Sequence, residues 1–133
     1  MSGTPSSAPG PLWATLGLKP GATLALVGTP DAFEVPELPP GARLLERASE
    51  PLDVTVFFAS REATLRGRMP LLAPWVAEGG SLWIAWPRED SGRETVLSAE
   101  VIALIGAEKG FAAGAVEVLD GTWRAMRLRR STP

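Results

Sequence analysis

The apolar residues of this chain fall into short runs that are separated by clusters of glycine, proline and charged residues. Residues 23–28, 53–59 and 81–86 form three such runs, and the middle one is rich in β-branched and aromatic side chains. Short apolar runs bounded by turn residues are typical of strands that are buried on both faces of a sheet. Residues 42–47 predict a further, shorter strand. The prolines before this strand leave no room for a full crossover helix.

Elsewhere the apolar spacing changes to that of helices. Between residues 60 and 80 apolar side chains recur at helical spacing, and Ser60 is the predicted N-cap. Two prolines inside this segment lack an amide donor, so we expect a bent helix or two pieces that end at the glycine pair 79–80. A second helix is predicted to begin after its N-cap Ser98 and to stop at Gly110.

The end of the chain predicts a hairpin. Residues 115–119 and 123–129 are two strand-like runs joined by Asp120 and Gly121, a pair that tolerates the positive φ of a hairpin turn. The arginines of the second run suit a strand near the edge of the sheet, where positive charges deter aggregation. The complete order predicts a Rossmann-like α/β fold with a mostly parallel sheet of about six strands, a C-terminal antiparallel hairpin and helices on both faces.

The residue types that are absent from this chain exclude several kinds of catalytic and metal site. The 133 residues contain no histidine, cysteine or tyrosine, which excludes thiol nucleophiles, imidazole and thiolate metal sites and the commonest general base. The net charge of -2 does not give the positive field that nucleic-acid binding requires. No apolar run approaches the roughly 20 residues of a membrane span, and no secretory signal pattern is visible. We expect a soluble, cytoplasmic protein with a flexible tail over residues 1–11 and one domain over residues 12–130.

Three short segments carry a resemblance to known proteins. They are residues 16–21 (LGLKPG), residues 83–87 (WIAWP) with the loop that follows, and the pair 122–123 (TW). The chain resembles a bacterial family of unknown function, and its fold is similar to a shortened class I S-adenosylmethionine-dependent methyltransferase. Members of the family usually carry a lysine after the proline and then serines, where this chain has Arg88 and, further on, Ser91. The resemblance implies the fold, and it implies no reaction because the family has no established activity.

The methyltransferase resemblance implies a cofactor loop that this chain carries only in part. In that superfamily the first strand ends in a loop with several glycines, which lets the backbone approach the methionine part of the cofactor. Here Gly28 is the single glycine of the turn, and Pro30 removes a backbone donor two residues later. The resemblance also implies an acidic residue after the second strand for the ribose hydroxyls. Glu46 or Glu50 takes that place, either as a ribose ligand or as an ordinary solvated charge.

The loop after the fourth predicted strand is the candidate ligand surface. In an open parallel sheet ligands bind beyond the carboxyl ends of the strands, and residues 87–94 leave the sheet at that edge. Arg88 and Arg93 flank Ser91, so two guanidinium groups, a hydroxyl and free amides can hold an anion there. The alternative is a solvated loop of loosely paired charges. Trp86, the last strand residue, either walls a pocket beside the loop or packs in the core.

We therefore predict a non-catalytic, methyltransferase-like domain without a cofactor, which binds a small anionic or nucleotide-like ligand or a protein partner, and neither membrane nor nucleic acid. The candidate ligand-binding residues are Gly28, Asp31, Glu46, Trp86, Arg88, Ser91 and Arg93. The alternative is a cofactor-binding enzyme related to the methyltransferases, with S-adenosylmethionine or a nucleotide at the same edge and Asp31, Glu89 or Asp90 as base. A third class, an oligomeric module, requires an exposed apolar patch, for example around Leu71 and Trp75.

Overall fold

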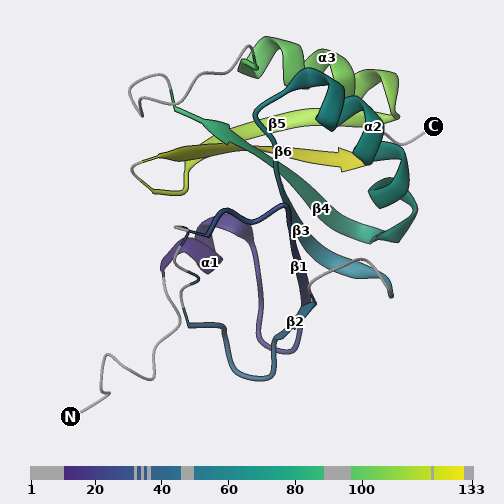
Figure 1. The fold of residues 1–133 in the computed structure, drawn as a ribbon. Coiled ribbons are helices and arrows are strands. Elements are labelled where there is room, and N and C mark those ends of the chain that lie inside the picture. Colours follow the sequence, from purple (N-terminus) through teal and green to yellow (C-terminus); the bar gives the residue numbers. More distant parts are fainter. Residues whose placement is uncertain are drawn as a thin grey trace.

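The computed structural model describes residues 11–31, 33, 35, 37–45, 50–88, 97–120 and 122–130. These residues build a six-stranded sheet in the order β2-β1-β3-β4-β6-β5, with helices on both faces (Figure 1). The strands are β1 (Thr23–Val27), β2 (Arg43–Leu45), β3 (Leu52–Phe58), β4 (Val76–Pro87), β5 (Phe111–Val118) and β6 (Trp123–Arg130). The helices are α1 (Pro11–Leu16), α2 (Glu62–Leu72) and α3 (Ala99–Glu108), and a short 3-10 turn, η2 (Ala73–Trp75), follows α2. The predicted Rossmann-like fold is confirmed, and the predicted tail lies outside the described residues except for Pro11, which begins α1.

The strand directions give the sheet two opposite ends, one at the carboxyl ends and one at the amino ends of its parallel strands. Strands β2, β1, β3 and β4 are parallel, and β6 runs antiparallel to both of its neighbours, β4 and β5. The carboxyl ends of the four parallel strands share one edge, the carboxyl edge, which lies beyond Val27 of β1 and Pro87 of β4. Their amino ends share the opposite edge, the amino edge, which lies before Thr23 of β1. The reversed strand β6 begins at the carboxyl edge, with Trp123 opposite Pro87, and ends at the amino edge.

Apolar cores lie on both faces of the sheet. Helices α2 and α3 cover one face with the buried side chains of Leu65, Met69, Leu72, Ile102 and Ile105. Helix α1 and the loop after β1 cover the other face with Trp13, Leu16 and Phe33. Figure 1 shows α2 and α3 at the top of the view and α1 at the lower left. The central strands bury side chains on both faces, which explains why they stand out in the sequence as continuous apolar runs.

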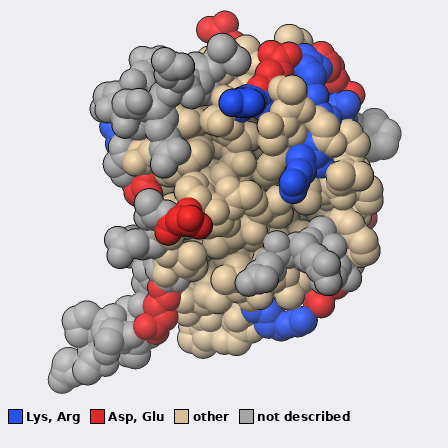
Figure 2. All heavy atoms as spheres, viewed as in Figure 1, with Lys and Arg blue, Asp and Glu red and all other residues tan. Residues whose placement is uncertain are grey.

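Helices α2 and α3 are also joined by charged side chains. Arg66 donates from Nε to Glu62 Oε2 at 2.8 Å and from Nη1 to Oε1 of Glu108 in α3. The bonds to Glu62 and then to Glu108 raise the pKa of Arg66 above its usual value. In Figure 2 blue and red spheres mix at the top of the molecule, where Figure 1 shows the two helices. Exposed pairs contribute little to stability, so the apolar core holds the helices in place.

The beginnings of the two longer helices differ from each other. Helix α3 has the predicted N-cap, because the Ser98 hydroxyl accepts a hydrogen bond from the Val101 amide at 3.3 Å. Helix α2 begins after Arg61, whose side chain makes no cap bond, so the predicted cap at Ser60 is wrong. Ser60 and Ser98 look alike in sequence, and only the position of the first helical turn separates them.

The glycine pair at 79 and 80 does not end a helix, as the apolar spacing had predicted. The segment does divide into two pieces, α2 and η2, but it stops at Trp75, and β4 begins at Val76. Gly79 has a φ of 80°, and a Cβ on Gly80 would stand 2.8 Å from the Leu52 carbonyl oxygen of β3. The pair therefore lets the beginning of β4 bend closely past β3, where the pairing of the two strands is irregular.

The arginine-rich strand β6 lies inside the sheet, and the edge strand at this end is β5. The predicted position near the edge of the sheet agrees with this order, although the arginines do not lie on the edge strand itself. Three of them place their guanidinium groups over aromatic rings: Arg124 over Trp86, Arg127 over Trp83 and Arg130 over Phe111, at 5.8, 5.7 and 5.8 Å from the ring centres. Because a guanidinium group can stack on a ring while its nitrogens reach water or an acceptor, arginine suits an inner strand here.

Candidate functional site

Gly28 is the first residue of the carboxyl edge after β1, and its backbone requires glycine. Its φ is 70°, and a Cβ at this position would stand 2.9 Å from the carbonyl oxygen of Phe58, the last residue of β3. The absent side chain thus lets the turn after β1 pass closely over the end of β3. This contact within the chain accounts for the glycine without any ligand.

Three aromatic side chains occupy the carboxyl edge on the α1 face of the sheet. Phe33, from the loop after β1, packs on Phe58 with ring centres 5.0 Å apart, and Trp123, the first residue of β6, meets Phe58 edge-on at 5.3 Å. All three are nearly fully buried, with exposed fractions of 9%, 4% and 6% for Phe33, Phe58 and Trp123. The aromatic trio of Phe33, Phe58 and Trp123 joins the turn after β1 to the ends of β3 and β4.

The other predicted site residues near this edge have different surroundings. Asp31 is exposed, close behind the turn at Gly28. Trp86 is 3% exposed and packs in the core beneath α2 and α3, which is the second of its two predicted roles. Leu71 and Trp75, named for the oligomeric alternative, are both exposed, at 67% and 37%.

Arg88 is tied to the turn between β5 and β6. Its amide donates to the Thr122 carbonyl oxygen at 2.7 Å, and its Nη1 donates to the Asp120 carbonyl oxygen at 3.2 Å. The Asp120 carboxylate in turn accepts from the amides of Thr122 and Trp123 at 2.8 and 2.9 Å. Arg88 therefore braces the exit of β4 against the hairpin.

The remaining predicted site residues, Glu46, Ser91 and Arg93, lie outside the described residues, as do Glu89 and Asp90. Within the described ranges no three acidic side chains come together in a way that could hold a metal ion. None of the helices in these ranges is long and apolar enough to cross a membrane.

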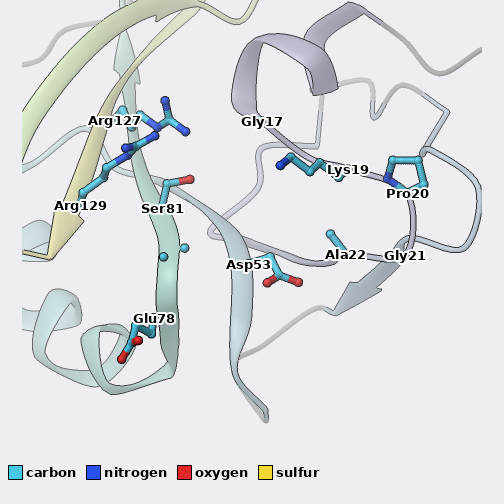
Figure 3. A pocket seen from close by; sticks show the side chains of 12 residues that line it. Gly17, Lys19, Pro20, Gly21, Ala22, Asp53, Glu78, Ser81, Arg127 and Arg129 are labelled. Carbon is cyan, nitrogen blue, oxygen red and sulfur yellow. The ribbon is translucent and has the colours of Figure 1, made fainter.

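The amino edge holds a cavity that the sequence did not predict. Its volume is about 480 Å³, and its lining comes from the turn after α1, from β3, from β4 and from β6. Figure 3 shows Arg127, Arg129 and Ser81 on one side of this hollow, with Lys19 directed toward them from the other side. One part of this cavity could have been predicted from the sequence. Residues two apart in a strand share a face, so Arg127 and Arg129 lie side by side.

Solved structures with a similar fold include an S-adenosylmethionine-dependent methyltransferase and a further methyltransferase that was solved with S-adenosylhomocysteine. One from Aquifex aeolicus is 13% identical, with a TM-score of 0.63 over 89% of this chain and 87% of that protein. A Burkholderia thailandensis methyltransferase, solved with 1,6-didemethyltoxoflavin and S-adenosylhomocysteine, is 14% identical, with a TM-score of 0.61 over 96% and 77% of the two chains. The DhpI–SAH complex is 9% identical, with a TM-score of 0.60 over 97% and 84%. No family model and no curated protein sequence matches the chain.

The chain has the class I S-adenosylmethionine-dependent methyltransferase fold in a short form. The sheet order, the reversed strand β6 and the long structural overlaps carry this assignment. At 9 to 14% identity the likeness concerns the fold alone. The function has to be argued from the side chains at the carboxyl and amino edges.

Proposed function

We propose that this protein is a methyltransferase-like binding domain that does not transfer methyl groups. The observation that carries the proposal is the aromatic trio at the carboxyl edge. Ligands of doubly wound sheets bind in the crevice outside the carboxyl ends of the strands. In this protein Phe33, a residue of the chain itself, is packed and buried beside the ends of β1 and β3, so a cofactor there would have to displace it.

The turn after β1 supports the same proposal. Gly28 is needed for its close approach to the Phe58 carbonyl oxygen, and Pro30 has no amide to offer a ligand. The Phe33 amide, further along this loop, is bonded to the Pro30 carbonyl oxygen at 3.0 Å. Two positions of the loop thus offer no free amide to a methyl donor, one because it is proline and one because its amide is bonded within the loop.

A calorimetric and thermal titration with S-adenosylhomocysteine and S-adenosylmethionine tests this proposal. A ligand at a hundred times its dissociation constant stabilises the folded state by about 2.7 kcal/mol, which raises the melting temperature of a domain of this size by more than about 5 °C. We expect no such rise with either compound. A methyltransferase of known affinity, titrated in parallel, shows that the ligands are intact.

The alternative, a cofactor-binding enzyme, draws support from the neighbours that were solved with S-adenosylhomocysteine bound. If either adenosyl compound produces a saturable heat and a rise of several degrees, the non-catalytic proposal is wrong. Methyl transfer then becomes the first hypothesis, and Asp31 is the described candidate for the base.

We further propose that Arg88 contributes to an anionic ligand site in the loop after β4. A thermal titration with adenosine monophosphate should stabilise a Lys19→Gln, Arg129→Gln variant, in which the amino-edge cavity has lost two cations, and adding Arg88→Ala to that variant should remove the response. Adding Arg68→Ala, at an exposed arginine of α2, is the matched control and should keep the response. An equal response with and without Arg88→Ala in this background would remove Arg88 from the site.

A further inference from the structure

The amino-edge cavity is separate from the site where this fold usually holds its ligand. It lies at the beginning of β1 and β3 and in the first part of β4. Gly28 and the aromatic trio lie at the other end of these strands. Its volume of about 480 Å³ is in the range of small-molecule sites, roughly 300–1,000 Å³. The cavity thus needs its own explanation, which the carboxyl edge does not supply.

Arg127 is the fixed cation of the cavity. Its guanidinium group lies 5.7 Å from the ring centre of Trp83, whose indole nitrogen donates to the Leu16 carbonyl oxygen at 3.2 Å. On the other side, a Cβ on Gly17 would stand 3.3 Å from Arg127 Nη2. The side chain is thus held between an indole ring and the turn that ends α1, so its position is set before any ligand arrives.

The end of α1 is shaped to admit this guanidinium group. The Gly17 amide donates to the Ala14 carbonyl oxygen at 3.2 Å, and the Leu18 amide donates to that of Trp13 at 2.9 Å, which is the Schellman pattern. This pattern places Gly17 at a φ of 80°. A side chain at Gly17 would be strained, and it would also press on Arg127.

Hydrogen-bonding capacity at Arg127 is left unused. The Arg127 Nε is buried and has no hydrogen-bond partner, and neither Arg127 nor Arg129 forms an ion pair with a described residue. Burial lowers the pKa of Arg127, and the positive charge of Arg129 lowers it further. Two neighbouring cations, one of them partly desolvated, are unfavourable in the empty cavity and become favourable with an anion between them.

The rest of the lining defines the kind of anion. Lys19 is directed toward the arginine pair from the turn after α1, and the hydroxyl-bearing Ser81 lies beside the pair (Figure 3). Three cations that line one cavity match a doubly charged group better than a carboxylate, and the arginine forks match phosphate oxygens. On the other side, Asp53 uses Oδ2 to accept from the Thr23 amide at 2.9 Å. Its other carboxylate oxygen can accept from a hydroxyl group of a ligand.

We propose that the amino-edge cavity binds a small phosphate ester, with its phosphate group on Arg127, Arg129 and Lys19 and a hydroxyl-bearing body toward Asp53. The cavity is larger than a bare phosphate requires, and Gly79 and Gly80 are part of its lining. The acidic side chains Asp53 and Glu78 at the far end restrict the negative charge of the ligand to one group. This proposal is independent of whether the carboxyl edge binds an adenosyl compound.

The test is a nuclear magnetic resonance titration of ¹⁵N-labelled protein that follows the Nε–H signal of Arg127. Loss of the signal in Arg127→Lys assigns it, because lysine keeps the charge and lacks this group. We expect a saturable shift with ribose 5-phosphate, a weaker one with inorganic phosphate, and none with ribose or with chloride at the same ionic strength. No saturable shift with either phosphate compound up to about 10 mM would overturn the proposal.

Paired variants separate the site from general charge effects. Lys19→Gln with Arg129→Gln should weaken ribose 5-phosphate binding at least about tenfold, since two charge-assisted bonds are lost. Arg61→Gln with Arg68→Gln removes the same charge from exposed positions at α2 and should leave the affinity unchanged. Equal weakening by both pairs would contradict the placement of the site at the amino-edge cavity. Equal affinity for inorganic phosphate and ribose 5-phosphate would contradict the proposal that the ligand is a phosphate ester. Both pairs lie at exposed positions, so the spectra should keep the wild-type dispersion.

Discussion

The two edges of this sheet use their side chains in opposite ways. At the carboxyl edge, Gly28 lets two backbone segments meet, and the aromatic trio closes the space around them. At the amino edge, glycines and small residues leave a hollow, and the Nε of Arg127 beside it is buried without a hydrogen-bond partner among the described residues. The turn after β1 and the aromatic trio serve packing, whereas the residues of the amino edge line a cavity.

The difference shows that fold position and side-chain chemistry are separate arguments. A doubly wound sheet predicts ligands at the carboxyl ends of its strands because loops and helix beginnings gather there. That rule describes where sites are built in most members of a fold class, and it does not require every member to keep one. Here the turn after β1 and the aromatic trio should carry stability and the amino-edge cavity should carry binding, and mutations can separate the two.

The largest effect is expected for Phe58→Ala at the carboxyl edge. Phe58 is 4% exposed and contacts both Phe33 and Trp123, so removing the ring should lower the free energy of unfolding by about 4 kcal/mol. Urea denaturation measures the loss. Val35→Ala, at a side chain that is 42% exposed, should cost less than about 0.5 kcal/mol.

A domain of ordinary stability keeps only about 5–15 kcal/mol, so Phe58→Leu, with an expected loss of about 1–2 kcal/mol, provides a milder variant that stays folded. If Phe58→Ala cost less than about 1 kcal/mol, the trio would not be closely packed. The carboxyl edge would then have room for a cofactor, and the contrast between the two edges would fail.

Glycine substitutions compare the edges directly. Gly28 and Gly79 both have positive φ, 70° and 80°, but a Cβ on Gly28 meets the Phe58 carbonyl oxygen at 2.9 Å, whereas nothing lies within 4 Å of one on Gly79. Gly28→Ala should therefore cost about 2–3 kcal/mol, from backbone strain and the clash together, and Gly79→Ala about 1 kcal/mol, from strain alone. Thermal unfolding of the two variants gives the difference. Equal losses would mean that the turn after β1 moves away easily.

The sheet and its helices could be predicted from the sequence because they depend on local patterns. The apolar runs at β1, β3 and β4 are bounded by turn residues, and the hairpin of β5 and β6 carries its own turn pair. The end of the segment from residue 60 to residue 80 was misplaced because a strand that is buried on one face and a helix can share apolar spacing over a few residues. The pairing of β4 with β3 on either side of Gly80, at Val76 and Ser81, places this glycine in a strand.

The amino-edge cavity depends on contacts between distant parts of the chain. Arg127 meets Trp83 and Gly17, which come from β4 and from the turn after α1, and no periodicity connects those three residues. The arginines of β6 predicted a strand near the edge of the sheet, which agrees with its position beside β5, but the sequence did not show that their guanidinium groups cover aromatic rings. The carboxyl-edge candidates were chosen by position in the fold, and of these the described Gly28, Trp86 and Arg88 all have packing or bracing contacts within the chain.

The smallest effect, and the sharpest contrast with the carboxyl edge, is expected for Arg129→Gln. Arg129 is exposed and its charge lowers the pKa of Arg127, so removing it should relieve repulsion and raise the free energy of unfolding by about 0.5 kcal/mol. The gain should be measured by urea denaturation at about 20 mM salt and should fade near 1 M, where charges more than about 3 Å apart are screened. Arg68→Gln, an exposed arginine of α2, should change stability at neither salt concentration.

The same Arg129→Gln variant should bind ribose 5-phosphate less tightly, so stability and binding change in opposite directions. A fall in stability would instead make Arg129 a structural residue, and the amino edge would then resemble the carboxyl edge in serving the fold.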